Sequence, residues 1–116
     1  ATNSNNTAIG YDAGSAVTTG VENTFVGSLA GDAITDADYN TALGSGALGL
    51  DDLGSFTTAI GRGALAKQNY ASATNSHNTA VGANAGEELT TATGNTLIGS
   101  LAGDALTTGV NSTIIG

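Results

Sequence analysis

The 116-residue sequence lacks cysteine, proline, methionine and tryptophan, and it contains only two cations, Arg62 and Lys67. Without cysteine, neither a disulfide framework nor a thiolate metal site can form. Ten carboxylates give a net charge of −8, which argues against nucleic-acid binding, because neutralising phosphates requires clustered lysine and arginine. No apolar run is long enough to span a bilayer, so we expect no membrane insertion by this segment.

The beginning of the chain also lacks expected features. There is no initiator methionine and no signal peptide, so we expect Ala1 to begin a processed chain or an excerpt. Aromatic residues make up only 4% and 18 residues are glycine, a composition that favours disorder. Against disorder, 40% of the residues are apolar, and they follow a regular pattern.

That pattern is a five-residue motif, Asn-Thr-x-(Ile/Val/Leu)-Gly, which recurs along the chain. Successive motifs are 17 residues apart, except for one step of 21 residues between Gly61 and Gly82. Thr57 and Ser112 replace the first asparagine in two copies. We therefore interpret residues 1–116 as a single repeat array of about seven coils with an insertion near 66–77, part of a longer fibre. We expect a structural ladder formed by Asn6, Thr7, Ile9, Asn23, Thr24, Val26, Asn40, Thr41, Leu43, Thr58, Ile60, Asn78, Thr79, Val81, Asn95, Thr96, Ile98, Thr113 and Ile115.

The period also predicts the fold class. Seventeen residues are too few for a helix-pair repeat, and frequent glycine and β-branched residues disfavour helix. Seventeen residues suit one coil of an all-β solenoid with two short parallel strands and tight turns. We expect the second, more polar strand near Ser15–Thr19 and Glu87–Thr91, on the outer face.

The motif strand is apolar on both faces, because alternate residues point to opposite sides. One face carries the threonine and the Ile/Val/Leu residue, and the other carries a mostly alanine column that begins at Ala8. A strand that is apolar on both sides is typically buried on both sides. We expect the Ile/Val column to face the inside of the coil and the alanine column to contact a partner chain.

The unit Asn-Thr-Ala-Ile-Gly-x-x-Ala-Gly, followed by an apolar residue and Thr-Thr-Gly, resembles the YadA-like head repeats of trimeric autotransporter adhesins and related phage tail fibres. The segment Ser45-Gly46-Ala47-Leu48 is similar to a variant of that repeat. The resemblance implies a left-handed parallel β-roll in a homotrimer, with the Ile/Val strand inside. It also implies an extracellular place, on a bacterial cell surface or a virion. Such rolls serve as receptor-binding heads in some proteins and as spacers in others.

Catalysis, cofactors and metals find little support in the sequence. A lone His77 without an orienting partner does not make an acid–base or nucleophilic site, so we expect no enzyme activity and no cofactor. The carboxylate pairs Asp36/Asp38, Asp51/Asp52 and Glu87/Glu88 are interpreted as solvating charges rather than a glycosidase pair. The calcium β-roll signature is absent, so we expect no metal ladder, although a single oxygen-ligand site near Asp36 and Asp38 stays an alternative.

Candidate ligand contacts gather in the 21-residue unit. Arg62, Lys67, Tyr70 and His77 lie there, and a protruding loop of this kind could contact a host-surface glycan or receptor. The alternative is a tolerated surface insertion. A regular threonine array could match ice, but we expect the motif threonines to be internal. The sequence therefore predicts a structural or adhesive segment of a trimeric surface fibre, with a monomeric β-solenoid that binds ice or carbohydrate as the alternative.

Overall fold

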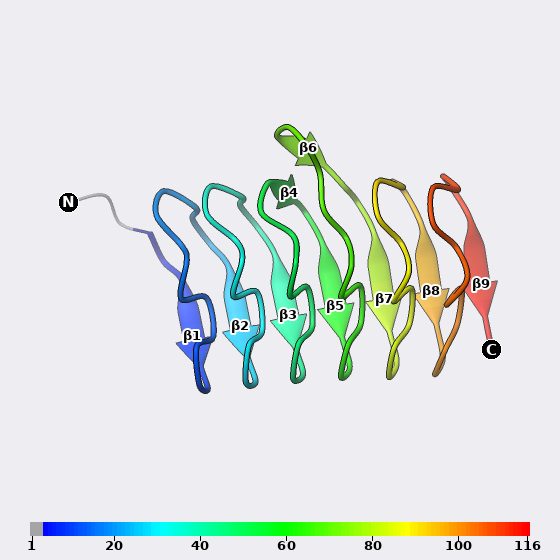
Figure 1. The fold of residues 1–116 in the computed structure, drawn as a ribbon, viewed down its shortest axis with the longest axis horizontal. Helices are drawn as coiled ribbons and strands as arrows, with labels where there is room; N and C mark the ends of the chain where they lie inside the picture. Colours follow the sequence, from blue (N-terminus) through cyan, green and yellow to red (C-terminus); the bar gives the residue numbers. More distant parts are fainter. Residues whose placement is uncertain (1–3) are drawn as a thin grey trace.

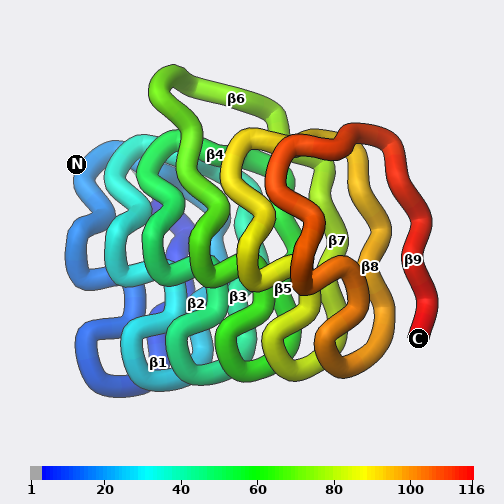
Figure 2. The backbone as a smooth tube through the Cα atoms, turned by 45° about the vertical axis from the view of Figure 1, so that its right-hand side comes forward, coloured from blue at the N-terminus to red at the C-terminus, as the bar shows by residue number. Residues whose placement is uncertain are grey.

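The computed structural model describes residues 4–116, and these residues form β-strands and turns with no helix. The chain winds into an elongated parallel β-solenoid in which each 17-residue repeat makes one coil (Figure 1). Its principal extents are 42 × 26 × 17 Å. The tube view shows the coils stacked side by side, with one loop protruding at β6 (Figure 2). The predicted all-β class and parallel solenoid are thus confirmed.

Seven three-residue strands form one parallel sheet in the order β1-β2-β3-β5-β7-β8-β9. The partners are in register with the sequence motif, so that Thr41 pairs with Thr58 and Ala42 with Ala59. The remaining two strands form a small parallel sheet, which joins the 21-residue unit to the coil before it. The bounds are β1 Thr7–Ile9, β2 Thr24–Val26, β3 Thr41–Leu43, β4 Gly54–Ser55, β5 Thr58–Ile60, β6 Thr74–Asn75, β7 Thr79–Val81, β8 Thr96–Ile98 and β9 Thr113–Ile115.

The glycine that closes each motif is required by the stacking of the coils. Gly44 has φ +134°, and a Cβ on it would lie 2.5 Å from the backbone carbon of Gly61 in the next coil. Gly61 stands in the same relation to Gly82. A side chain at this position would therefore force neighbouring coils apart, and only glycine allows the strand to turn here at the observed spacing.

The second strand of each coil, predicted near Ser15–Thr19 and Glu87–Thr91, does not form. Both ranges are turns and bends. The reason is local: positive φ at Asp12 and Gly14, 52° and 59°, turns the chain just before Ser15, and the Val17 amide then donates to the Gly14 carbonyl at 3.2 Å, the hydrogen bond of a tight turn. Successive coils still bond here, because the Gly14 amide donates to the Ala30 carbonyl at 3.0 Å.

The two faces of the motif strand are the reverse of the expected assignment. The middle residue of each strand points into the coil: Phe25, Ala42 and Leu97 are completely buried. The Ile/Val/Leu column points outward instead, and Leu43 is 47% exposed. The interior of the coil is too narrow for two rows of large side chains, so the mostly alanine column fits there and the larger column faces out.

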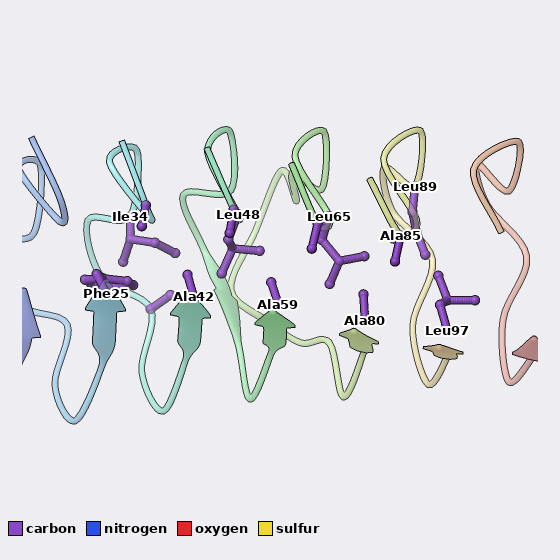
Figure 3. Close-up of a cluster of buried hydrophobic side chains, with 14 of the residues drawn as sticks. Phe25, Ile34, Ala42, Leu48, Ala59, Leu65, Ala80, Ala85, Leu89 and Leu97 are labelled. Atoms are coloured by element: carbon purple, nitrogen blue, oxygen red, sulfur yellow. The ribbon is translucent and has the colours of Figure 1, made fainter. Parts of the chain in front are cut away.

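Inside the coils, large and small side chains alternate between the strand and the opposite turn (Figure 3). Phe25 lies between Gly14 and Gly31, and a Cβ on either glycine would come within 2.6 Å of the Phe25 ring. In the coil of β3 the strand residue Ala42 is small, and a leucine six residues later fills the space: Leu48 is completely buried. The coil of β7 has a small residue at both positions, and leucine side chains from the two neighbouring coils pack there instead.

Buried asparagines join the coils through their side chains. The Asn23 amide group donates to the Ala37 carbonyl at 2.8 Å, and the Asn23 side-chain oxygen accepts from the backbone amide of Asn40 at 2.8 Å. Both groups of the side chain are therefore satisfied although Asn23 is fully buried. The same pattern links Asn6, Asn23, Asn40 and Thr57, and again Asn78, Asn95 and Ser112.

Candidate functional site

The four candidate contact residues of the 21-residue unit do not form one site. Arg62 and Lys67 each line one of two neighbouring hollows that share Gly46 and Ala66. His77 belongs to a separate surface, where it stacks on Phe56. The Tyr70 side chain is only 6% exposed, so its ring has little surface to offer a ligand.

The two hollows exist because two successive coils lack a side chain at one surface position. The hollow beside Lys67 has a volume of about 360 Å³ and the hollow beside Arg62 about 270 Å³. This position is the third residue after each strand of the seven-stranded sheet. Together these residues form the C-edge column, which consists of Asp12, Leu29, Gly46, Gly63, Asn84 and Leu101.

The two cations beside the hollows differ in how they are paired. The Lys67 ammonium lies 2.5 Å from a Glu88 carboxylate oxygen, and this hydrogen bond raises the pKa of Lys67. The Arg62 guanidinium donates to the side-chain oxygen of Asn84 at 3.3 Å, which is a neutral partner. Arg62 therefore keeps its charge available to a further contact, whereas the charge of Lys67 is already met.

At the other end of the strands, three rings stack along the solenoid. The ring centroids of Tyr39 and Phe56 are 4.9 Å apart, and those of Phe56 and His77 are 5.4 Å apart. Tyr39 and Phe56 are 45% and 42% exposed. These rings belong to the N-edge column. It contains the residue two positions before each strand of the seven-stranded sheet: Asn5, Glu22, Tyr39, Phe56, His77, Gly94 and Asn111.

Every residue of both columns has positive φ, because the chain must turn sharply on either side of each strand. Tyr39 and Phe56 both have φ 59°, a conformation that favours glycine and asparagine over bulky side chains. The sequence interpretation missed Tyr39 and Phe56. The signal was present, because they lie 17 residues apart and share the position of His77 in the repeat.

Beneath the protruding loop lies a buried polar cluster, where the asparagine ladder is interrupted at Thr57. The Gln68 amide group donates to Asp51 at 2.6 Å and to the Thr57 hydroxyl at 3.0 Å. The Asn78 amide group donates to Gln68 at 2.8 Å and to the Tyr70 hydroxyl at 3.1 Å. In turn, the Tyr70 hydroxyl donates to the Ala92 carbonyl at 2.7 Å. The cluster takes the place of the missing asparagine and holds the loop to the solenoid.

Burial shifts the titration of two members of this cluster. The pKa of Asp51 is raised to about 6 from 3.8 by desolvation, which outweighs the hydrogen bonds from Gln68 and the backbone amide of Gly54. Desolvation, with a smaller contribution from the Asp51 charge, also raises the pKa of Tyr70. The cluster is closed by its own hydrogen bonds, and among the described residues no buried polar side-chain atom is without a partner.

The outer face of the seven-stranded sheet is apolar and uncovered in a single chain. Each strand presents a threonine and an isoleucine, valine or leucine outward, and no outward position carries a charge. Away from the ends, Leu43 is 47% and Ile98 40% exposed. A continuous apolar stripe on a chain of net charge −8 is typical of an interface.

The carboxylates proposed as a cation site have local partners. Asp36 accepts a hydrogen bond from the Thr19 hydroxyl, and Asp38 accepts one from the backbone amide of Val21 at 2.8 Å. Over residues 4–116, no three histidine, aspartate or glutamate side chains come together as metal ligands would. Asp51 and Asp52 separate as well, since Asp51 is buried and Asp52 accepts from the Thr35 hydroxyl.

Within the same residues there is no helix long and apolar enough to cross a membrane. Neither a protein-family model, nor a curated protein, nor a solved structure matches this chain.

Proposed function

We propose that this chain is a segment of a homotrimeric surface fibre, built as a left-handed β-roll of the YadA-like head type. Its function would be structural and adhesive: to project a binding tip, or to present repeated weak contacts along its length. Such a fibre would stand on a bacterial cell surface or a virion. The repeat motif and the parallel solenoid support the proposal.

The observation that carries the proposal is the uncovered outer face of the sheet. Completing the burial of a half-exposed isoleucine or leucine contributes about 1 kcal/mol, and every strand of the seven-stranded sheet offers an isoleucine, leucine or valine that is at least partly exposed. The stripe is long and narrow, because each strand has only three residues. Copies of the same chain, set side by side around a common axis, would cover this stripe along its whole length.

A charge placed on the stripe tests the proposal. Ile60 lies on β5, in the middle of the sheet, and Ile60→Asp would bury a carboxylate against two other copies. We expect this variant to be a folded monomer by sedimentation velocity, with the circular dichroism of the unaltered chain. Thr91→Asp is the matched control, because Thr91 is an exposed turn residue. If Ile60→Asp assembles as the control does, the stripe is not the interface.

A second candidate function gains support from the corrected orientation of the strand. The motif threonines lie on the outer face beside the aliphatic column, in register from coil to coil, so the face could bind ice or a carbohydrate as a monomer. We favour the fibre because the aliphatic residue changes among Ile, Val and Leu, so its methyl groups do not repeat regularly. Thermal hysteresis in a monomeric sample would reverse this preference.

A further inference from the structure

Beyond the aliphatic stripe, the turns at both ends of the strands are exposed, and in three coils a larger side chain at one end accompanies a glycine at the other. In Figure 1 the strands run from top to bottom, so the turns that lead into the strands lie above the sheet and the turns that follow lie below it. The N-edge column belongs to the upper turns and the C-edge column to the lower turns. In a trimer, one strand from each copy would surround the common axis, and the end of each strand would lie next to the start of the strand from the neighbouring copy. The N-edge column of one copy would then meet the C-edge column of the next.

We propose that the aromatic stack of one copy docks onto the glycine positions of the neighbouring copy, and so sets the register of the three chains. This inference rests on the proposed homotrimer and adds to it a specific contact between the two edges. The Tyr39 and Phe56 rings of a second copy would lie at the Gly46 and Gly63 positions, and its His77 ring would lie beside Asn84.

The size matching is the observation that carries this inference. In the coils of β3 and β5, Tyr39 accompanies Gly46 and Phe56 accompanies Gly63. In the coil of β8 the order is reversed, because Gly94 accompanies Leu101. In these three coils, a bulky group on one edge is thus matched by the absence of a side chain on the other; the other three coils carry a side chain on both edges.

Contacts within one chain account for part of this matching: a Cβ on Gly63 would lie 2.5 Å from the side-chain oxygen of Asn84, and a Cβ on Gly94 would lie 2.3 Å from that of Asn111. They do not account for Gly46, because no atom of the described residues lies within 4 Å of a Cβ placed there. The residues that line the two hollows include no member of the N-edge column. Within one chain, the side chains of the N-edge column therefore do not restrict the size of those in the C-edge column. A neighbouring copy that contacts the C-edge column can restrict it.

The conformation of the rings supports the same conclusion. Tyr39 and Phe56 occupy the left-handed region although asparagine, which tolerates it better, stands at Asn5 and Asn111 in the same column. Their stacking leaves each ring more than two-fifths exposed. Burial of the rings against a neighbouring copy would offset the unfavourable backbone conformation. In the isolated chain the rings stay partly exposed, so this compensation is missing.

Among the charged groups along the edges, Arg62 favours the contact, whereas Glu22 would lie opposite Leu29 in the in-register arrangement. Arg62 lies in the same coil as Phe56, and among the described residues its guanidinium donates only to the neutral Asn84 side chain. In the assembly it would face an aromatic ring, which attracts a cation. A slip of one coil would place Tyr39 against Leu29 in one direction and His77 against Leu101 in the other. Only the in-register arrangement puts every ring opposite a small or polar residue.

The test is a leucine at the open position. Gly46→Leu should fold normally, because Leu29 and Leu101 adopt φ 59° and 61° in the same column and Gly46 has φ 66°. It should weaken trimer formation about tenfold or more by obstructing Tyr39 of the neighbour. Tyr39→Gly combined with Gly46→Leu copies the Gly94/Leu101 pair and should restore assembly. Thr91→Leu adds the same side chain away from both edges and should assemble normally.

Dilution series followed by sedimentation velocity, with circular dichroism for the fold, distinguish the outcomes. If the unaltered chain is trimeric and Gly46→Leu assembles equally well, or the double variant is not restored, the edge contact is overturned while the trimer stands. Tyr39→Asn is an independent test, because it removes the ring and adds no leucine that could disturb the fold. This variant should assemble less well than the unaltered chain, and undiminished assembly would also overturn the contact. A monomeric unaltered chain whose ring signals shift with a neutral oligosaccharide would overturn both proposals.

Discussion

The packing inside the coils predicts that two destabilising substitutions compensate each other. Gly31→Leu places a side chain where a Cβ alone would lie 2.4 Å from the Phe25 ring. Backbone strain is not the obstacle, because Leu48 adopts φ 55° at the equivalent position and Gly31 has φ 57°. Overpacking should cost about 1–3 kcal/mol or more. Phe25→Ala empties the same space and should cost about 3–5 kcal/mol.

The double variant, Phe25→Ala with Gly31→Leu, reproduces the Ala42/Leu48 pair found in the next coil. We expect its free energy of unfolding to lie within about 2 kcal/mol of the unaltered chain, so the coupling between the two sites should exceed about 2 kcal/mol. Urea unfolding at one fixed chain concentration, followed by circular dichroism, measures all four proteins. The reciprocal pair, Ala42→Phe with Leu48→Gly, should behave in the same way.

Additivity would refute this reasoning. If the double variant loses the sum of the two single losses, the Phe25 ring and the Leu48 side chain do not fill equivalent space. The volume of the interior would then not explain why the alanine column faces inward.

Two further predictions concern the polar groups inside the coils. The pKa of Asp51 is raised in the folded state to about 6 from 3.8, so the folded chain binds this proton more tightly. The contribution of Asp51 to stability should therefore be greatest below about pH 4 and should fall by about 3 kcal/mol as the pH rises through 6. Asp51→Asn should remove this fall, as urea unfolding at pH 4 and pH 7 would show, and an unchanged pH profile would contradict the assignment. Asn40→Ala leaves the buried Gly54 carbonyl and Thr57 amide without partners and should cost about 3 kcal/mol. Asn69→Ala, on the exposed surface, should cost little in the same assay.

The sequence was sufficient to predict the parallel β-solenoid, because the repeat fixes which residues stack, but the second strand that it predicted in each coil does not form. It was not sufficient to predict which face of the strand points inward, since both faces are apolar and alternation alone is symmetric. The deciding signal was a correlation at a spacing of six residues: Phe25 accompanies Gly31, whereas Ala42 accompanies Leu48. Such exchange of volume identifies the column that shares the interior with the opposite turn.

The candidate site was harder to predict because its members come from different coils. Clustering in sequence brought Arg62, Lys67, Tyr70 and His77 together, but the solenoid separates them by column rather than by unit. Tyr70 was grouped with exposed residues although its hydroxyl bonds to Ala92, 22 residues away. In a repeat fold, residues at the same position of successive units form a surface, and grouping by position would have found the stack of Tyr39, Phe56 and His77.

We propose that copies of the same chain cover the apolar outer face, and the mass of the unaltered chain in solution is the first measurement to make. Multi-angle light scattering across a dilution series should give a particle of three chains, which dissociates only at low concentration. A folded particle with the mass of one chain at every concentration, with its aliphatic column open to solvent, would contradict the account.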